Sequence, residues 1–215
     1  MRPMPPFALA ALTAPELAPP EMIEVAFKTG YSRVGLRLTP VAPGSWAYPL
    51  MDDQAMLRET LARIADTGVG VTVLPLTDLF IMGRDQDNNV RRGVADANFL
   101  VEHGVNCSLS TNNVLNPVTP YGDCSLIRMA NLHANVLQIG QAAQLREIFA
   151  MLTHRSARLL NLTDYGIAVG NPADIVVIDA KSPEEAVAEI RQPLAVFKRG
   201  RQTVKRHVAE LLRPV

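Results

Sequence analysis

The sequence is poor in aromatic residues, which make up 5% of its 215 residues. It also lacks an excess of either charge, because its 21 basic residues are balanced by 21 acidic ones. A nucleic-acid surface needs a basic patch and commonly stacks bases on aromatic side chains. These absences argue against a nucleic-acid partner, and we expect any ligand to be a small-molecule substrate.

Cysteine is nearly absent, and long hydrophobic runs are missing. Cys107 and Cys124 are the two cysteines, and no CxxC pair suggests a metal or redox site. We interpret them as reduced thiols in a cytoplasmic protein. The apolar run near the N-terminus is short and broken by prolines, so no membrane association is expected.

Apolar residues make up 48% of the chain, which is enough for a sizeable core. Strand-like runs alternate with helical patterns through the first half. Asp52 or Asp53 is expected to cap a helix that ends at Gly68. This alternation predicts parallel strands joined by right-handed crossovers. The predicted strands are 7–13, 33–38, 70–75 and 105–109. Further helices are expected from Pro20 to Gly30, at 91–103, from the end of the polar loop 110–123 to about Ile139, at 142–152 and at 154–161.

The pattern changes near Gly166. A buried strand is predicted at 174–179, followed by a short helix capped by Ser182 and a β-hairpin around Gly200. We therefore divide the chain into segments 1–71, 72–165 and 166–215.

Residues 72–204 contain several recognisable stretches, including TVLPLTDLFIMGR, NNVLNP, THRSARLLNL and DYGIAVGNPADIVVIDA. Together they resemble the cytosine-deaminase-like amidohydrolase superfamily. The resemblance implies the last two βα units of a TIM-type barrel, followed by part of a small β domain. It also implies hydrolysis of C–N bonds in cyclic amides or amidines.

Residues 7–71 are similar instead to the opening βα units of a sugar phosphate isomerase/epimerase of the xylose-isomerase-like barrel type. The stretches that carry this likeness are FALAALTAPELAPPEMIEVAFKTGYSRVGLRL and PLMDDQAMLRETLARIADTGVGV. We favour a fusion of the two families, with the join near TGVGVTVLP. An amidohydrolase with an unusual N-terminal segment is the alternative.

The amidohydrolase resemblance implies a divalent metal, zinc or iron, held by an HxH pair, further histidines and an aspartate on the last strand. The sequence has no HxH pair, and Asn112 stands at the aspartate position. A neutral amide replaces a carboxylate poorly as a metal ligand. Asn112 is thus a doubtful catalytic residue, with Asn113 and Asn116 as candidate substrate contacts, and no metal ligand is assigned. An asparagine-rich loop turn is the alternative explanation.

The four histidines are given structural roles: a helix end for His103, packing for His133, a helix start for His154 and solvent exposure for His207. The predicted fold class is α/β, an incomplete TIM-type barrel of about four βα units with a partial C-terminal β segment. Four parallel strands leave two open edges, so a homo-oligomer that closes two half-barrels is expected if the chain folds stably. The predicted function is a catalytically incomplete amidohydrolase. An isomerase-like protein and a non-catalytic binding or subunit protein are the alternatives.

Overall fold

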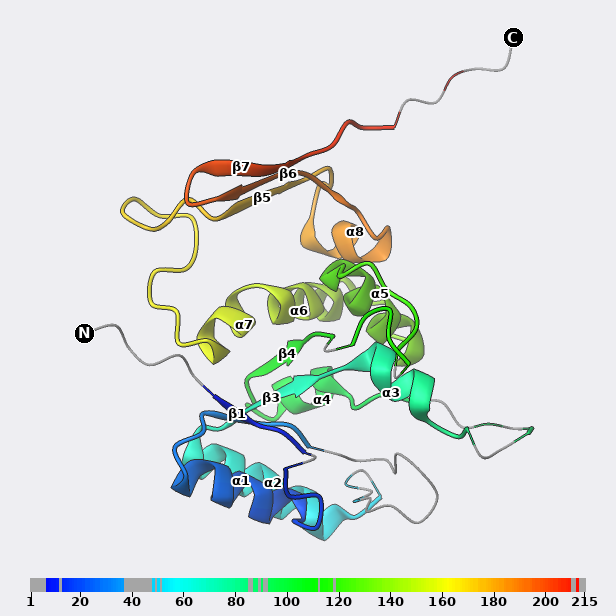
Figure 1. Ribbon diagram of the computed structural model, residues 1–215, viewed down its shortest axis with the longest axis vertical. Coiled ribbons are helices and arrows are strands. Elements are labelled where there is room, and N and C mark those ends of the chain that lie inside the picture. The colour runs from blue at the N-terminus through cyan, green and yellow to red at the C-terminus, as the bar shows by residue number, and fades with distance from the viewer. Residues whose placement is uncertain are drawn as a thin grey trace.

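The computed structural model describes residues 7–11, 13–36, 48, 50, 52–84, 87–88, 90, 93–111, 113–117, 119–209 and 212. Its first sheet contains β1 (Ala8–Leu9), β2 (Arg33–Val34), β3 (Gly70–Val73) and β4 (Cys107–Leu109) in the order β1-β2-β3-β4. All three neighbouring pairs are parallel, which confirms the predicted βα arrangement (Figure 1). No described strand pairs with the outer edge of β1 or β4, so the sheet is open here.

Seven helices accompany this sheet in the described chain. They are α1 (Pro19–Lys28), α2 (Gln54–Thr67), α3 (Pro75–Ile81), α4 (Ala97–Glu102), α5 (Leu126–Val136), α6 (Ala142–Leu152) and α7 (His154–Leu159). Their apolar faces and the strands form one core, in which Ile23, Val71 and Ile148 are almost fully buried.

The helix ends follow the local sequence. The Asp53 carboxylate accepts hydrogen bonds from the backbone N–H groups of Ala55 and Met56, at 3.0 and 2.9 Å, and so caps α2. Gly68 ends α2 with φ +69°, a left-handed conformation that costs glycine little. Both features confirm the predicted cap and stop.

Several elements differ from the prediction. Among the described residues of 7–13 and 33–38, strand structure is limited to β1 and β2. The strand expected at 70–75 ends at Val73, and α3 begins at Pro75, because proline suits a first helical turn that needs no N–H donor. The helix expected at 91–103 is shortened to α4. Its start is set by Asp96, whose carboxylate accepts from the backbone N–H of Phe99 at 2.9 Å.

Helix α7 lies on one face of the parallel sheet, against the N-terminal ends of β2, β3 and β4. A Cβ placed on Gly70 would lie 1.9 Å from Leu159 Cδ2, so only glycine leaves room for this leucine. The Asn106 amide donates to the Arg155 carbonyl at 3.1 Å, and Arg33 Nε donates to the Leu159 carbonyl at 2.8 Å. These contacts hold α7 across β2, β3 and β4.

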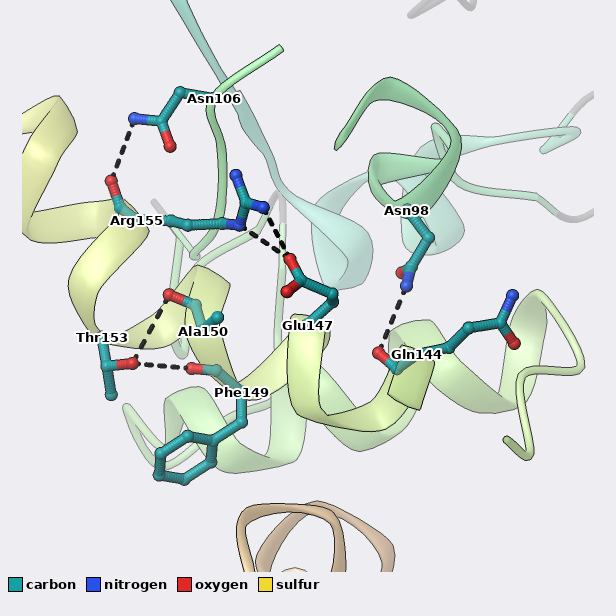
Figure 2. Close-up of polar contacts among 8 residues, drawn as sticks. All are labelled: Asn98, Asn106, Gln144, Glu147, Phe149, Ala150, Thr153 and Arg155. Atoms are coloured by element: carbon teal, nitrogen blue, oxygen red, sulfur yellow. Dashed lines mark hydrogen bonds and ion pairs between the residues drawn. The ribbon is translucent and has the colours of Figure 1, made fainter. Parts of the chain in front are cut away.

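Polar contacts also join α6 to its neighbours (Figure 2). Arg155 contacts Glu147 Oε2 through Nε at 2.9 Å and Nη2 at 2.7 Å, and the Asn98 amide donates to the Gln144 carbonyl at 3.3 Å. These bonds tie α7 to α6 and α6 to α4.

A second, antiparallel sheet has the order β5-β6-β7, with β5 (Ile175–Ile178), β6 (Pro193–Lys198) and β7 (Arg201–Lys205). We call it the small sheet. Helix α8 (Pro183–Ala188) links β5 to β6, and the Ser182 hydroxyl accepts from the Glu185 N–H at 3.2 Å, as predicted. The Asn131 amide of α5 donates to the Val187 carbonyl at 3.0 Å and so fixes α8 on the helices below (Figure 1). No described helix is long and apolar enough to cross a membrane.

Candidate functional site

The carboxyl ends of parallel strands form the mouth of a βα fold, where sites on barrels of this kind lie. After β4 the chain turns back on itself between Asn113 and Tyr121. Asn116 and Thr119 exchange two backbone hydrogen bonds of 3.1 Å, and the Leu115 N–H donates to the Tyr121 carbonyl at 3.5 Å. We call residues 113–117 and 119–121 the mouth hairpin.

Two of the predicted site residues meet in this hairpin. The Asn116 Nδ2 donates to Asn113 Oδ1 at 2.8 Å, and Asn116 Oδ1 accepts from the Thr119 N–H at 2.9 Å. The Thr111 hydroxyl donates to the Asn113 carbonyl at 3.0 Å. Asn112, the predicted catalytic position, lies outside the described residues. The structure therefore brings Asn113 and Asn116 together within the mouth hairpin.

Helix α3, which follows β3, anchors the mouth hairpin from the side. The hydroxyls of Thr77 and Thr119 lie 3.1 Å apart, and both residues are buried. The Phe80 and Tyr121 rings meet edge to face with centroids 5.9 Å apart, and the Arg84 guanidinium lies 4.8 Å from the Phe80 centroid. The sequence interpretation missed these anchors, because Pro75 was read as the end of a strand rather than the start of a helix.

Small polar side chains line the sheet below the mouth. Thr72 of β3 and Ser108 of β4 are direct neighbours in register, and their hydroxyl oxygens lie 2.8 Å apart. Val71, Val73, Cys107 and Leu109 point to the other side, because side chains alternate along a strand, and they belong to the apolar core. The face of Thr72 and Ser108 is the one that would line a barrel interior.

The histidines do not gather at this mouth. His103 ends α4, where its Nδ1 lies 2.8 Å from the Phe99 carbonyl, and His207 is exposed, as predicted for both. His154 is the first residue of α7. His133 is completely buried in α5, and neither of its ring nitrogens has a hydrogen-bond partner in the described structure. Burial lowers the pKa of His133 to about 4, although nearby Asp96 acts in the opposite direction.

The other candidate groups also have structural roles. Cys107 is buried in β4, and burial raises the pKa of its thiol to about 12, so it is no nucleophile at neutral pH. Asp123 receives hydrogen bonds from the Ser125 N–H at 3.1 Å and from Arg128 Nη2 at 2.8 Å. The Arg128 hydrogen bond holds the pKa of this carboxyl below its usual value. Asp123 thus contacts the first turn of α5, whose N-cap is Ser125.

A metal site needs several His, Cys, Asp or Glu side chains that lie close together. Within the described ranges, no group of three or more His, Cys, Asp or Glu side chains is placed to hold a metal ion. The described residues therefore do not fit the divalent metal that the amidohydrolase resemblance implies.

Comparisons with known proteins now bear on this geometry. Residues 45–205 match the model of the Amidohydrolase family. N-isopropylammelide isopropyl amidohydrolase of Pseudomonas sp. (strain ADP) is 33% identical over 110 residues, which cover 51% of this chain and 27% of that protein. The chain therefore aligns with only a minor part of this relative's length.

Two solved structures share the fold. A 5-methylcytosine deaminase from Klebsiella pneumoniae liganded with 5-fluorocytosine matches 89% of this chain and 52% of its own, with a TM-score of 0.75 and 21% identity. An atrazine chlorohydrolase from Arthrobacter aurescens complexed with zinc matches 83% of this chain and 38% of its own, with a TM-score of 0.52 and 21% identity.

The comparisons correct the expectation for the N-terminal segment. The family match begins at residue 45 and so crosses the predicted junction between 71 and 72, and the deaminase fold matches most of the chain. Nothing here supports an isomerase-like origin of residues 7–71. A βα rhythm with capped helices is common to many barrels, so these local patterns did not identify the family.

Proposed function

Since this chain belongs to the amidohydrolase family, we propose that its mouth binds a nitrogen heterocycle, a cyclic amide or amidine with a hydrolysable C–N bond, and that the chain by itself is catalytically incomplete. The observation that carries this proposal is the mouth hairpin, which α3 fixes at the carboxyl ends of β3 and β4. The names of the matched proteins, which refer to isopropylammelide and 5-methylcytosine, favour the same class of ring.

Asn113 and Asn116 are the proposed ring contacts. A primary amide carries N–H donors and a carbonyl oxygen with two lone pairs, so a side chain that already holds a loop hydrogen bond can also pair with the edge of a cyclic amide. Their mutual hydrogen bond holds both side chains in one orientation before a ligand arrives, and this lowers the entropic cost of binding.

Water activation is not assigned to this chain. The described residues offer no metal donor group, and the sequence has Asn112 at the position where the resemblance implies an aspartate. We therefore give this chain the binding and orientation of the ring. We do not expect ammonia release from the chain by itself, whether zinc or iron is added.

The test is fluorine NMR of 5-fluorocytosine with the purified protein. We expect the ligand signal to broaden, and we expect Asn113→Asp to weaken binding roughly tenfold, the effect of about one hydrogen bond. This variant keeps an oxygen that can accept from Asn116 and replaces the amide donors with a negatively charged carboxylate. Asn161→Asp, at an exposed position after α7, is the control. An unbroadened signal would contradict ring binding, and zinc-dependent ammonia release from 5-methylcytosine would contradict the assignment of water activation.

A non-catalytic half-barrel that acts as a binding or subunit protein is the second candidate, and the absence of a metal donor group in the described ranges favours it. In its subunit form, in which the mouth binds no ring, it predicts neither signal broadening nor ammonia release. The isomerase alternative is not retained. The division at residues 71 and 165 and the cytoplasmic location stay part of the proposal. The free thiols of Cys107 and Cys124 fit a reducing compartment.

A further inference from the structure

A cavity of about 190 Å³ lies at the N-terminal ends of β3 and β4, at the opposite end of these strands from the mouth. The lining residues of one wall lie between Leu61 and Gly70, where α2 ends and β3 begins. Those of the other wall are residues 103–106, which join α4 to β4. Both walls belong to successive helix–strand units inside the region that matches the family model, and the mouth hairpin takes no part in them.

The walls of this cavity are largely apolar. They include Leu61, Ile64, Val69 and Val105, of which the last three are almost fully buried. Since a cavity of about 150 Å³ holds a benzene ring, this one has room for an apolar body of roughly four carbon atoms with a polar head. The rim is open at two glycines, because a Cβ placed on Gly68 or Gly104 would meet nothing within 4 Å.

The rim of the cavity is negative, because both bordering helices end beside it. The last carbonyl groups of a helix have no intrahelical partner, and they form the negative end of the helix dipole. Neither α2 nor α4 has a basic residue in its last turn that would offset this charge. The exposed acidic residues Asp66 and Glu102 occupy these turns instead.

The His103 ring adds a hydrogen-bond acceptor to the lining. Its Nδ1 lies 2.8 Å from the Phe99 carbonyl oxygen, and this oxygen can only accept, so Nδ1 is the donor. The other nitrogen of the neutral ring, Nε2, is then an acceptor. The Phe99 ring, whose centroid is 4.1 Å from that of His103, helps to hold the imidazole in place. The acceptors of the lining therefore favour a ligand with N–H donors.

We propose that this cavity binds a small organic cation, a primary alkylammonium ion whose carbon chain lies on the apolar walls and whose ammonium group lies at the ends of α2 and α4. An ammonium group offers three N–H donors and no acceptor, which matches carbonyl groups and an imidazole nitrogen. Its positive charge is favoured at helix C-termini. This proposal does not depend on the proposed function.

Protein NMR with butylammonium chloride, at constant ionic strength, tests the ligand class on the full chain. We expect the amide signals of Gly68, Gly70 and Gly104 to shift and to saturate with a dissociation constant of roughly 1 mM, as suits a ligand of this size. 1-Butanol has the same carbon chain without the charge and should bind roughly fivefold more weakly. Butyrate should not bind. Unshifted glycine signals, or equal affinities for butylammonium and 1-butanol, would overturn the proposal.

Two substitutions in α2 locate the binding site. Ala65→Leu places a larger side chain in the cavity and should abolish the shifts at Gly68 and Gly104. Ala62→Leu is the matched control, because Ala62 is exposed in the same helix and does not line the cavity. Leucine is a good helix former, so both variants should keep well-dispersed amide spectra. Unchanged butylammonium binding in Ala65→Leu, or equal loss in both variants, would contradict a site at this cavity.

Discussion

The parallel layer, which comprises β1–β4 and α1–α7, and the small sheet contain strands of similar composition but bury them differently. Val71 and Val73 of β3 are 5% and 3% exposed, whereas Val176 and Val177 of β5 are 53% and 44% exposed. The residue type is the same, so the difference comes from what covers each strand. Helices pack against β3, whereas no described element covers Val176 and Val177, which point to opposite faces of β5. The burial of a strand, and the stability that burial provides, thus depend on packing against other elements rather than on strand propensity.

The largest effect is expected from truncation of the same kind of side chain in both regions. Ile148→Ala should lower the free energy of unfolding by about 2–5 kcal/mol, because Ile148 is fully buried in α6 and the substitution leaves a cavity. Val177→Ala should change it by less than about 0.5 kcal/mol, because this side chain is largely in water. Urea unfolding followed by circular dichroism measures both values. Equal losses would show that the small sheet is covered in solution.

The pH dependence of the unfolding free energy reports on His133, which is buried in the parallel layer. The pKa of His133 is about 4 in the folded chain, against 6.5 as its ordinary value. Above pH 6.5 the ring is neutral in both states, and its contribution is fully present. Between pH 6.5 and 4 the unfolded chain binds the proton and the folded chain does not, so stability falls by about 3 kcal/mol.

Urea unfolding at pH 7.5 and pH 4.5 measures this loss. His133→Leu is the matched control, because it removes the titrating ring and its two unpartnered nitrogens while keeping an apolar group of comparable size. In this variant the part of the pH dependence that comes from residue 133 should disappear. If the free energy of unfolding changed between the two pH values by the same amount in His133→Leu as in the unmodified chain, His133 would have to have a partner or reach water.

A smaller effect is expected where α7 meets the parallel sheet. Gly70→Ala places a Cβ where Leu159 Cδ2 now lies, so α7 must shift, at a cost of about 1–3 kcal/mol. Gly140→Ala is the control, because nothing lies within 4 Å of its added Cβ and its backbone is not in the left-handed region. That variant should be neutral or stabilised by up to about 1 kcal/mol. Thermal unfolding compares the two, and equal behaviour would contradict the close approach of Leu159.

Local signals in the sequence predicted the elements that they control directly. Ser182, Pro183 and the following glutamates lie within one turn, and α8 begins where they indicate. The parallel order of the strands followed from the alternation of strand and helix patterns. Long-range contacts were not visible in this way. Gly70 meets Leu159 across the fold, and no local pattern links the two.

The candidate site shows the same limit. The NNVLNP stretch drew attention to Asn113 and Asn116, and the structure joins them by a hydrogen bond. Spacing did not reveal that Asn116 would also bind the Thr119 backbone, because that bond depends on how the mouth hairpin bends. The role of Thr77 was missed for a related reason, since it required α3 to be recognised first.

The smallest effect is expected from removal of helix N-caps, and it tests whether the parallel layer and the small sheet unfold together. Asp53→Ala and Ser182→Ala each remove one N-cap hydrogen-bond acceptor, at a cost of about 1 kcal/mol. Helix α2 belongs to the buried parallel layer, so loss of its cap should lower the global unfolding free energy. Helix α8 connects β5 and β6 of the exposed small sheet, so loss of its cap should mainly promote local opening, although Ala186 and Val187 of α8 are buried against α5 and α6.

Hydrogen exchange separates the two cases, because about 1 kcal/mol corresponds to roughly fivefold faster exchange. Ser182→Ala should accelerate exchange in α8 and β5–β7 while leaving α5 and α6 unchanged. If the Ser182 variant instead accelerated exchange in α6 as strongly as in β6, the contact between Asn131 and the end of α8 would couple the two regions into one cooperative unit. The contrast in burial between β3 and β5 would then describe two faces of a single folding unit, because α8 would transmit the stability of the helices to the small sheet.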